Sequence, residues 1–113
     1  MECLSSKSCV PCHGGVPRLE GEEIEALLGQ LSGWRVMDEH HLHKAYKFTN
    51  FADALAFVNR VGEIAEREGH HPDISFGWGY ARFEIYTHAI GGLSESDFIL
   101  AAKIDEAAKI NEA

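Results

Sequence analysis

The spacing of apolar residues along this chain alternates between the period of a helix and the period of a strand. Three stretches place apolar side chains three and four residues apart, as one buried face of a helix requires: 20–31, 51–67 and the stretch that follows Ser94. Two pairs of short stretches alternate in polarity, as strands with one covered face do: 34–38 with 42–48, and 74–78 with 81–88. The predicted order is therefore helix, two strands, helix, two strands, helix.

Strands that arrive in pairs predict hairpins, and hairpins predict an antiparallel sheet. We expect an α+β fold, with a four-stranded antiparallel sheet and three helices packed on one face, in the order α-β-β-α-β-β-α. The other face or an edge of the sheet would then stay open. A small protein often covers such a surface by self-association, so we expect a homodimer or a homotetramer.

Residues that favour helix ends flank the predicted helices. Asn50 offers a capping side chain to the second helix, and Gly69 is where the chain most easily leaves it. Ser94, with Asp97 three residues on, forms a variant of the capping box at the start of the third helix. The buried stripe of the second helix is predicted to consist of Phe51, Leu55, Val58, Val61 or Gly62, and Ala65.

The first 18 residues show no hydrophobic period and contain two prolines and the pair Gly14-Gly15. Residues 1–18 are therefore predicted to form an irregular N-terminal arm. The rest of the chain, 19–113, has a usual size for one domain and can bury a modest core. We expect a single folded domain after the arm.

All three cysteines, Cys3, Cys9 and Cys12, lie in this arm, whereas a disulfide framework would spread an even number across the fold. Cys9 and Cys12, followed by His13, have the spacing of half a zinc site or of a redox pair. Because the chain has no second cysteine pair, a reduced segment with a structural or incidental role is the other interpretation. We predict neither a metal site nor a cofactor.

The formal net charge of −8 argues against binding to nucleic acid or to an anionic membrane, because both depend on clustered lysine and arginine. No apolar run approaches the ~20 residues of a membrane span. The segment from Met1 to Lys7 lacks the basic and apolar regions of a secretory signal. We therefore expect a soluble, cytoplasmic protein with no nucleic-acid or membrane partner.

Three of the seven histidines sit at predicted element boundaries. His70 and His71 follow the second helix, and His88 lies at the far end of the last strand. Histidine has an unperturbed pKa of about 6.5, so several imidazoles in one pocket could serve as acid and base in one reaction. Glu66, one turn before His70, and Asp97, at the next helix start, are candidates to orient or charge these imidazoles.

Other kinds of site fit the sequence less well. Adjacent residues of an extended segment point in opposite directions, so His70 and His71 are poorly placed to bind one metal ion together. We interpret His40, His41 and His43 as solvated residues of a turn and a strand face. The chain also lacks a nucleophile elbow and a glycine-rich phosphate loop. Acid/base chemistry without a metal or a covalent intermediate is what remains.

The family of pterin-4a-carbinolamine dehydratases has a similar series of residues, which reads here Glu66-x3-His70-His71-Pro72-x5-Trp78-x9-His88-x8-Asp97. Three further groups also stand as that family has them: Leu31-x-Gly33-Trp34, Phe51 with Ala54 and Phe57, and Gly92-Leu93-Ser94-x2-Asp97. The resemblance covers about residues 20 to 107 and leaves the arm outside.

The resemblance implies loss of water from a 4a-hydroxytetrahydropterin, such as 4a-hydroxytetrahydrobiopterin, to give a quinonoid dihydropterin. This product is later reduced for reuse by aromatic amino acid hydroxylases. The family's three catalytic histidines match His70, His71 and His88. The resemblance further assigns substrate-binding or supporting roles to Glu66, Pro72, Thr87, Asp97 and Trp34. One imidazolium can protonate the departing C4a hydroxyl while a neutral imidazole accepts a ring N–H proton, and either role is open to each histidine.

Two positions depart from the pattern of some family members. Gly69 stands where some carry an aspartate, and Ser96 stands where some carry an arginine, so this chain has fewer charges near the expected pocket. Animal members of the family also act as dimerisation cofactors of a homeodomain transcription factor. The alternative hypothesis is therefore a dimerisation or partner-binding module of the same fold with little catalytic role.

Overall fold

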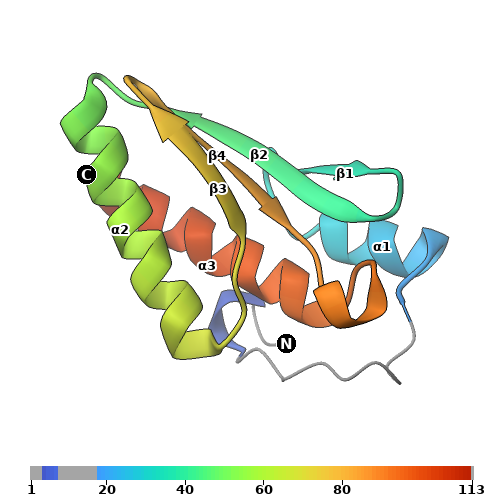
Figure 1. Ribbon diagram of the computed structural model, residues 1–113. Coiled ribbons are helices and arrows are strands. Elements are labelled where there is room, and N and C mark those ends of the chain that lie inside the picture. The colour runs from blue at the N-terminus through green and yellow to red at the C-terminus, as the bar shows by residue number, and fades with distance from the viewer. Residues whose placement is uncertain (1–3, 8–17, 113) are drawn as a thin grey trace.

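A computed structural model describes residues 4–7 and 18–112 of the chain. Its helices and strands follow the predicted order (Figure 1). Their bounds are η1 Leu4–Ser6, α1 Gly21–Leu28, β1 Arg35–Met37, β2 His41–Lys47, α2 Phe51–Glu68, β3 Asp73–Gly77, β4 Tyr80–Ile85, η2 His88–Ile90 and α3 Glu95–Glu112, where η marks a short 3-10 helix. The prediction of an α+β fold with three α-helices and an antiparallel sheet is confirmed.

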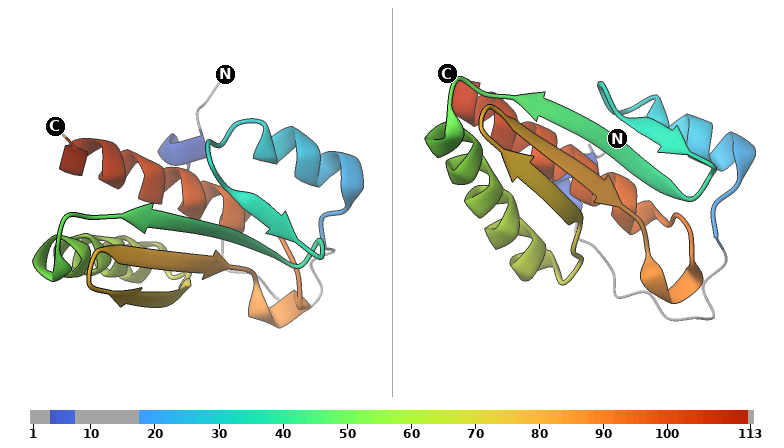
Figure 2. Two further views of the ribbon diagram at one scale, coloured as in Figure 1. Left: turned by 90° about the horizontal axis from the view of Figure 1, so that it is seen from above. Right: turned by 45° about the horizontal axis from the view of Figure 1, so that its top comes forward.

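The four strands form one sheet in the order β1-β2-β4-β3, and every neighbouring pair is antiparallel. The edge strands are therefore β1 and β3. The helices α2 and α3 pack against the same face of the sheet, and α1 lies beside α3 near the β1 end (Figures 1 and 2). Within residues 4–7 and 18–112, no helix covers the opposite face.

The core lies between the sheet and the helices. Along β4, Ala81, Phe83 and Ile85 are fully buried and alternate with exposed Arg82 and Glu84, as a strand with one covered face requires. The largest fully buried side chains that meet them are Leu42 of β2, Phe57 and Val61 of α2, and Phe98, Leu100 and Ile104 of α3. Burying a side chain of this size contributes about 1.5–3 kcal/mol, so this layer anchors the segments that carry the candidate site.

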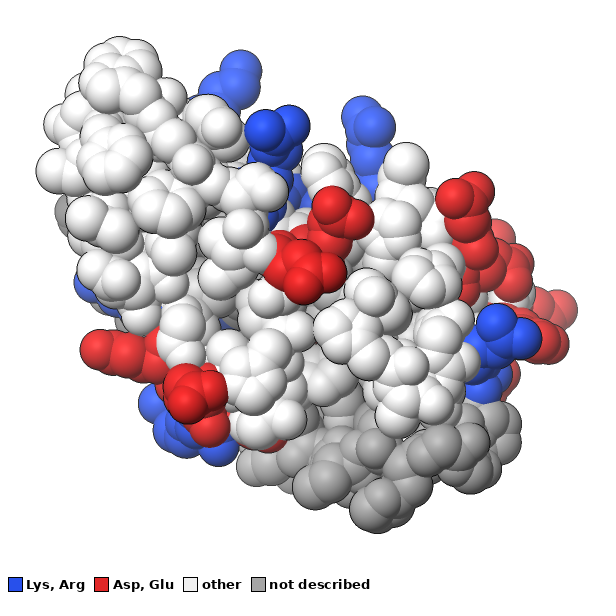
Figure 3. Space-filling view, viewed as in Figure 1, with Lys and Arg blue, Asp and Glu red and all other residues white. Residues whose placement is uncertain are grey.

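The predicted buried stripe of α2 is partly wrong. The residues that the fold buries are Ala54, Phe57, Val61, Ile64 and Ala65. Phe51 and Leu55 are exposed instead. The apolar arc of α2 is wider than the surface that the sheet and α3 cover, and apolar spacing alone does not select which part is covered. The surface over the start of α2 and the β3–β4 turn consequently carries little charge (Figure 3).

Two predicted strands end earlier than expected. Trp78 lies in the β3–β4 turn and is 72% exposed. β4 ends at Ile85, because Thr87 then forms an isolated antiparallel bridge with Gly92 and its N–H donates to the Gly92 carbonyl at 2.8 Å. His88 therefore lies on the short η2 turn and not at a strand end.

Part of the predicted N-terminal arm packs on the domain. η1 contacts α3, and Leu4 is buried in the core. The cysteines Cys3, Cys9 and Cys12, together with His13, lie outside the described residues, so both interpretations of that segment stay predictions. Among the described helices, none has the length and apolar character needed to cross a membrane.

Candidate active site

The end of α2 positions the first two histidines. Gly69 adopts a left-handed conformation, with φ of 67° and ψ of 26°, and its N–H donates to the Ala65 carbonyl. This is a common way for a glycine to end a helix, because a side chain would be strained there. The chain then runs through His70, His71 and Pro72 into β3. The two histidines face different surroundings: the His70 side chain is 13% exposed, and that of His71 is 59% exposed.

His70 is held by a buried carboxylate. Its Nε2 lies 2.5 Å from Oδ1 of Asp97, which is fully buried in the first turn of α3. The other oxygen, Oδ2, accepts the Thr87 hydroxyl at 2.9 Å and the Ser94 backbone N–H at 2.8 Å. A helix N-terminus favours a negative charge at this place. Thr87 and Ser94 therefore fix the Asp97 carboxylate and, through it, the His70 ring.

One of the two hydrogen bonds of the predicted capping box is present at the start of α3. The Asp97 carboxylate accepts the Ser94 N–H, as the motif requires. The Asp97 N–H donates to the Ser94 carbonyl at 3.1 Å, while the Ser94 hydroxyl lies 2.8 Å from the Thr87 hydroxyl. The capping carboxylate is therefore shared between the helix start and the histidine.

His71 has a weaker support. Its Nε2 lies 2.5 Å from Oε2 of Glu66, one turn back along α2, but the Glu66 side chain is 79% exposed. An exposed pair of this kind holds its geometry with less than about 1 kcal/mol. His71 is therefore freer to turn toward a ligand than His70.

His88 is held by an aromatic ring. It is exposed on η2, and its ring centroid lies 4.1 Å from that of Tyr86, at an interplanar angle of 72°. Tyr86 in turn packs on His40, with 4.4 Å between the ring centroids. Edge-to-face packing of this kind is a preferred arrangement of aromatic rings. The bridge between Thr87 and Gly92 fixes the loop from which His88 projects.

The three histidines border one pocket. A cavity of about 270 Å³ is lined by Gly69, His70, His71, Tyr86, Thr87, His88 and Ala89. This is close to the lower end of the usual range of ligand pockets, about 300–1,000 Å³, and suits a small molecule. Imidazoles that border one small pocket can both give and accept protons at one ligand.

The other residues predicted for the site lie at different distances from this pocket. Glu66 contacts His71, and the Thr87 hydroxyl points to Asp97. Pro72 directs the chain into β3 without lining the pocket. Among the described residues, sequence reasoning missed Tyr86, although Tyr86 shares a side of the predicted strand with His88, two residues away. It also missed the contact of the Ser94 hydroxyl with Thr87.

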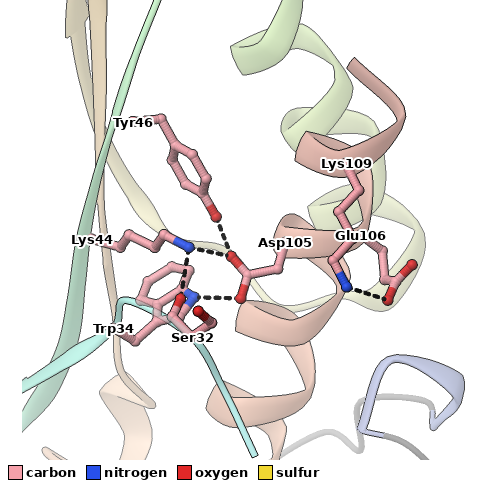
Figure 4. Close-up of polar contacts among 7 residues, drawn as sticks. All are labelled: Ser32, Trp34, Lys44, Tyr46, Asp105, Glu106 and Lys109. Carbon is pink, nitrogen blue, oxygen red and sulfur yellow. Dashed lines mark hydrogen bonds and ion pairs between the residues drawn. The ribbon is translucent and has the colours of Figure 1, made fainter. Parts of the chain in front are cut away.

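The structure does not bring Trp34 to the histidine pocket. The Trp34 side chain is buried, and its Nε1–H donates to Oδ2 of Asp105 at 3.0 Å (Figure 4). Asp105 also accepts the Lys44 ammonium at 2.7 Å and the Tyr46 hydroxyl. This cluster ties the β1–β2 hairpin to α3, beside a separate cavity of about 420 Å³.

His40 and His41 of the β1–β2 hairpin are more buried than the solvated residues that we predicted, and both have side-chain partners. His40 and His41 are half-buried, with their Nδ1 atoms 3.1 Å apart, and His41 Nε2 lies 3.2 Å from the Glu84 carboxylate. In the part of the chain that the structure describes, no three His, Cys, Asp or Glu side chains have an arrangement suited to a metal ion.

Comparison with known proteins gives one consistent family. The sequence model of the pterin 4 alpha carbinolamine dehydratases matches residues 17–107. A Rubrobacter xylanophilus protein, provisionally named as such a dehydratase, is 61% identical over 105 residues, which cover 93% of this chain and 98% of that protein. A Rickettsia canadensis protein with the same provisional name is 54% identical, over 93% of this chain and 97% of that protein.

Two solved structures are also similar. One is described as a transcriptional coactivator/pterin dehydratase from Brucella melitensis, with a TM-score of 0.77 and 28% identity over 81% of this chain and 99% of that one. The other is described as a pterin dehydratase-like protein that is a RuBisCO assembly factor in the alpha-carboxysome. Its TM-score is 0.59 at 28% identity, over 67% of this chain and 89% of that one. The family resemblance of the sequence is thereby confirmed, and the chain belongs to the pterin 4 alpha carbinolamine dehydratase family.

Proposed function

We propose that this protein removes water from 4a-hydroxytetrahydrobiopterin, or from a closely related 4a-hydroxytetrahydropterin, with His70, His71 and His88 as acids and bases. Membership of the family and the names of the relatives support the dehydratase class. The observation that carries the finer proposal is the single pocket bordered by three histidines from two separate segments of the chain. The product, a quinonoid dihydropterin, would re-enter tetrahydropterin recycling.

The reaction requires two proton movements. The C4a–O bond breaks as a proton reaches the departing hydroxyl, and a neighbouring ring N–H loses a proton so that a C=N double bond forms. Water and the quinonoid ring account for all atoms, and no electrons are exchanged, so the proposed reaction needs no redox cofactor. Imidazoles suit both transfers near neutral pH.

Each histidine offers a ring nitrogen to such a ligand. In His70 and His71, Nε2 is engaged by a carboxylate, so Nδ1 is the atom left to exchange a proton with the substrate. The His88 ring packs against Tyr86 and borders the same pocket, within reach of a ligand held there. Tyr86 adds an aromatic wall against which a flat pterin ring can pack.

A comparison of single variants tests this proposal. The rate of loss of the carbinolamine is measured with wild-type protein, with His70→Ala, with His88→Ala and in buffer alone. General acid–base catalysis contributes about 10²–10⁴-fold, so each variant should lose most of the acceleration over buffer. His43→Ala, which removes an imidazole outside the pocket, should keep the wild-type rate. Equal rates for wild type and both pocket variants would refute the proposal.

A second candidate function is partner binding. The two similar solved structures are described as a transcriptional coactivator and as an assembly factor, and the described surface here exposes the large apolar side chains of Phe51, Leu55 and Trp78. Such side chains mark association surfaces when they gather in one patch. If partner binding is the main role, the His70→Ala and His88→Ala variants should still bind a partner as wild type does.

A further inference from the structure

Two buried residues with hydroxyl groups lie at the histidine pocket: Thr87 in its lining and Ser94 next to Thr87. Thr87 lies between β4 and η2, and Ser94 directly precedes α3. Both residues are almost wholly buried, and Ser94 does not line the pocket. A buried hydroxyl needs a hydrogen-bond partner, so the partners of these two hydroxyls indicate what the residues do.

The hydrogen bonds run in one direction. The Thr87 hydroxyl donates its proton to Asp97 Oδ2 at 2.9 Å. A hydroxyl group has one proton, so Thr87 can only accept in its 2.8 Å contact with the Ser94 hydroxyl. The Ser94 hydroxyl also lies 3.5 Å from Asp97 Oδ2, but its contact with Thr87 is much shorter, so Ser94 donates chiefly to Thr87, and Thr87 donates to Asp97.

This order fixes the carboxylate of Asp97. Oδ2 accepts both the Thr87 hydroxyl and the Ser94 backbone N–H, so the carboxylate cannot rotate without the loss of two hydrogen bonds. Oδ1 is thereby aimed at Nε2 of His70, 2.5 Å away. Since a carboxylate only accepts, the proton of a neutral His70 ring must sit on Nε2, which leaves the lone pair on Nδ1.

We propose that Ser94 and Thr87 are positioning residues that act through Asp97 to fix the orientation and the Nε2–H tautomer of His70. The catalytic part of this inference rests on the dehydratase function proposed above. His71 provides the contrast within the same pocket, because the side chain of its carboxylate partner, Glu66, is 79% exposed.

The first test reads the tautomer without any activity measurement. Two-bond ¹H–¹⁵N correlation spectra of histidine-labelled protein, recorded where the ring is neutral, distinguish Nε2–H from Nδ1–H, and the loss of a signal in His70→Gln assigns it. Wild type should show the Nε2–H form for His70. Thr87→Val, which removes a direct donor to Asp97, should show a mixture of both forms, and Ser94→Ala, which acts one hydrogen bond further away, should show a smaller share of the Nδ1–H form. Ser94→Thr, which keeps a hydroxyl, should restore the wild-type spectrum.

The second test reads turnover. Ser94 lies outside the pocket lining, so Ser94→Ala should lower kcat by about tenfold, which corresponds to the net contribution of one hydrogen bond, and leave KM within about twofold. Ser94→Thr should recover most of kcat. The control is Ser75→Ala, which removes an exposed hydroxyl on β3 and should change neither parameter.

The two tests separate two kinds of failure. If wild type does not accelerate dehydration but Ser94→Ala still mixes the His70 tautomers, the dehydratase proposal fails and the positioning inference stands. If wild type is active and Ser94→Ala keeps both the pure Nε2–H signal and the wild-type kcat, the positioning inference is overturned. Should Thr87→Val fail to fold, the Ser94 pair of variants decides alone.

Discussion

His70 and Asp97 are 27 positions apart in the sequence, yet Nε2 of the imidazole lies 2.5 Å from Oδ1 of the fully buried carboxylate. This contact joins the end of α2 to the start of α3 across one end of the sheet. A catalytic imidazole needs a defined tautomer and a defined direction, and a buried carboxylate supplies both more firmly than an exposed one. The contact therefore links the packing of the helices to the proposed chemistry.

Asp97→Asn should impair the reaction more than any other single change outside the histidines. The amide oxygen can still accept from Thr87 and Ser94, which turns the amide NH₂ toward His70 and favours the opposite ring tautomer. We expect a fall in kcat of about 100-fold, within the range that proton-transfer catalysis contributes. Steady-state kinetics with the carbinolamine measures it.

The matched control is Glu66→Gln, the same change at the exposed partner of His71. Because both side chains of that pair are largely exposed, its effect on stability should stay within about 0.5 kcal/mol. Its kcat should fall less than that of Asp97→Asn. Equal losses in the two variants would contradict the account of an ordered His70 and a freer His71.

Two glycines of α2 should respond to alanine in opposite directions. Gly69 has φ of +67°, where an alanine is strained, so Gly69→Ala should destabilise the fold by about 1 kcal/mol. Gly62 lies inside the helix, and a Cβ there would have no neighbour within 4 Å, so Gly62→Ala should stabilise by about 0.5–1 kcal/mol. Urea unfolding of the two variants measures the difference; a stabilising Gly69→Ala would show that the helix does not end as described.

Much of the fold could be predicted because its signals are local. The Asn50 side chain caps α2 by accepting the Asp53 N–H at 2.8 Å, and Gly69 ends α2 in the left-handed conformation. The convergence of His70, His71 and His88 on one pocket was also predicted from the expected helix and strand ends, although His88 lies on η2 and not at the end of β4.

The remaining features depend on contacts between distant segments, which no local period reveals. Polarity alternates as far as His88, yet the bridge of Thr87 to Gly92 ends β4 at Ile85. Trp34 donates to Asp105, 71 positions later, so no local signal separates Trp34 from the pocket. The covered part of α2 is likewise chosen by packing on the sheet and α3 and not by its own apolar spacing.

The cluster around Asp105 should matter for stability and not for turnover. Lys44 and Asp105 are both largely buried, so Asp105→Ala leaves the ammonium, the Trp34 N–H and the Tyr46 hydroxyl without their shared acceptor. Breaking a buried pair in this way costs about 3–5 kcal/mol. Thermal unfolding should show this loss, whereas Glu106→Ala, at the exposed pair with Lys109, should change stability by less than about 0.5 kcal/mol. Similar losses in both variants would contradict the structural role of the cluster.

Self-association through the outer side of α2 is a further expected property. Phe51 and Leu55 are exposed on this helix, and β3 beside it is an edge strand. We expect a dimer or tetramer in light scattering, and Leu55→Glu should shift it toward the monomer. Ala56→Glu adds the same charge at a neighbouring exposed position and should leave the assembly intact. A wild-type protein that is monomeric at all concentrations would contradict this prediction.

The most direct measurement of the central claim is a stopped-flow record of the decay of 4a-hydroxytetrahydrobiopterin with wild-type protein and with the double variant His70→Gln/His88→Gln. We expect a decay well above the buffer rate for wild type and a return to the buffer rate for the double variant, with thermal unfolding showing that the double variant is still folded. A folded double variant that is as fast as wild type would contradict it.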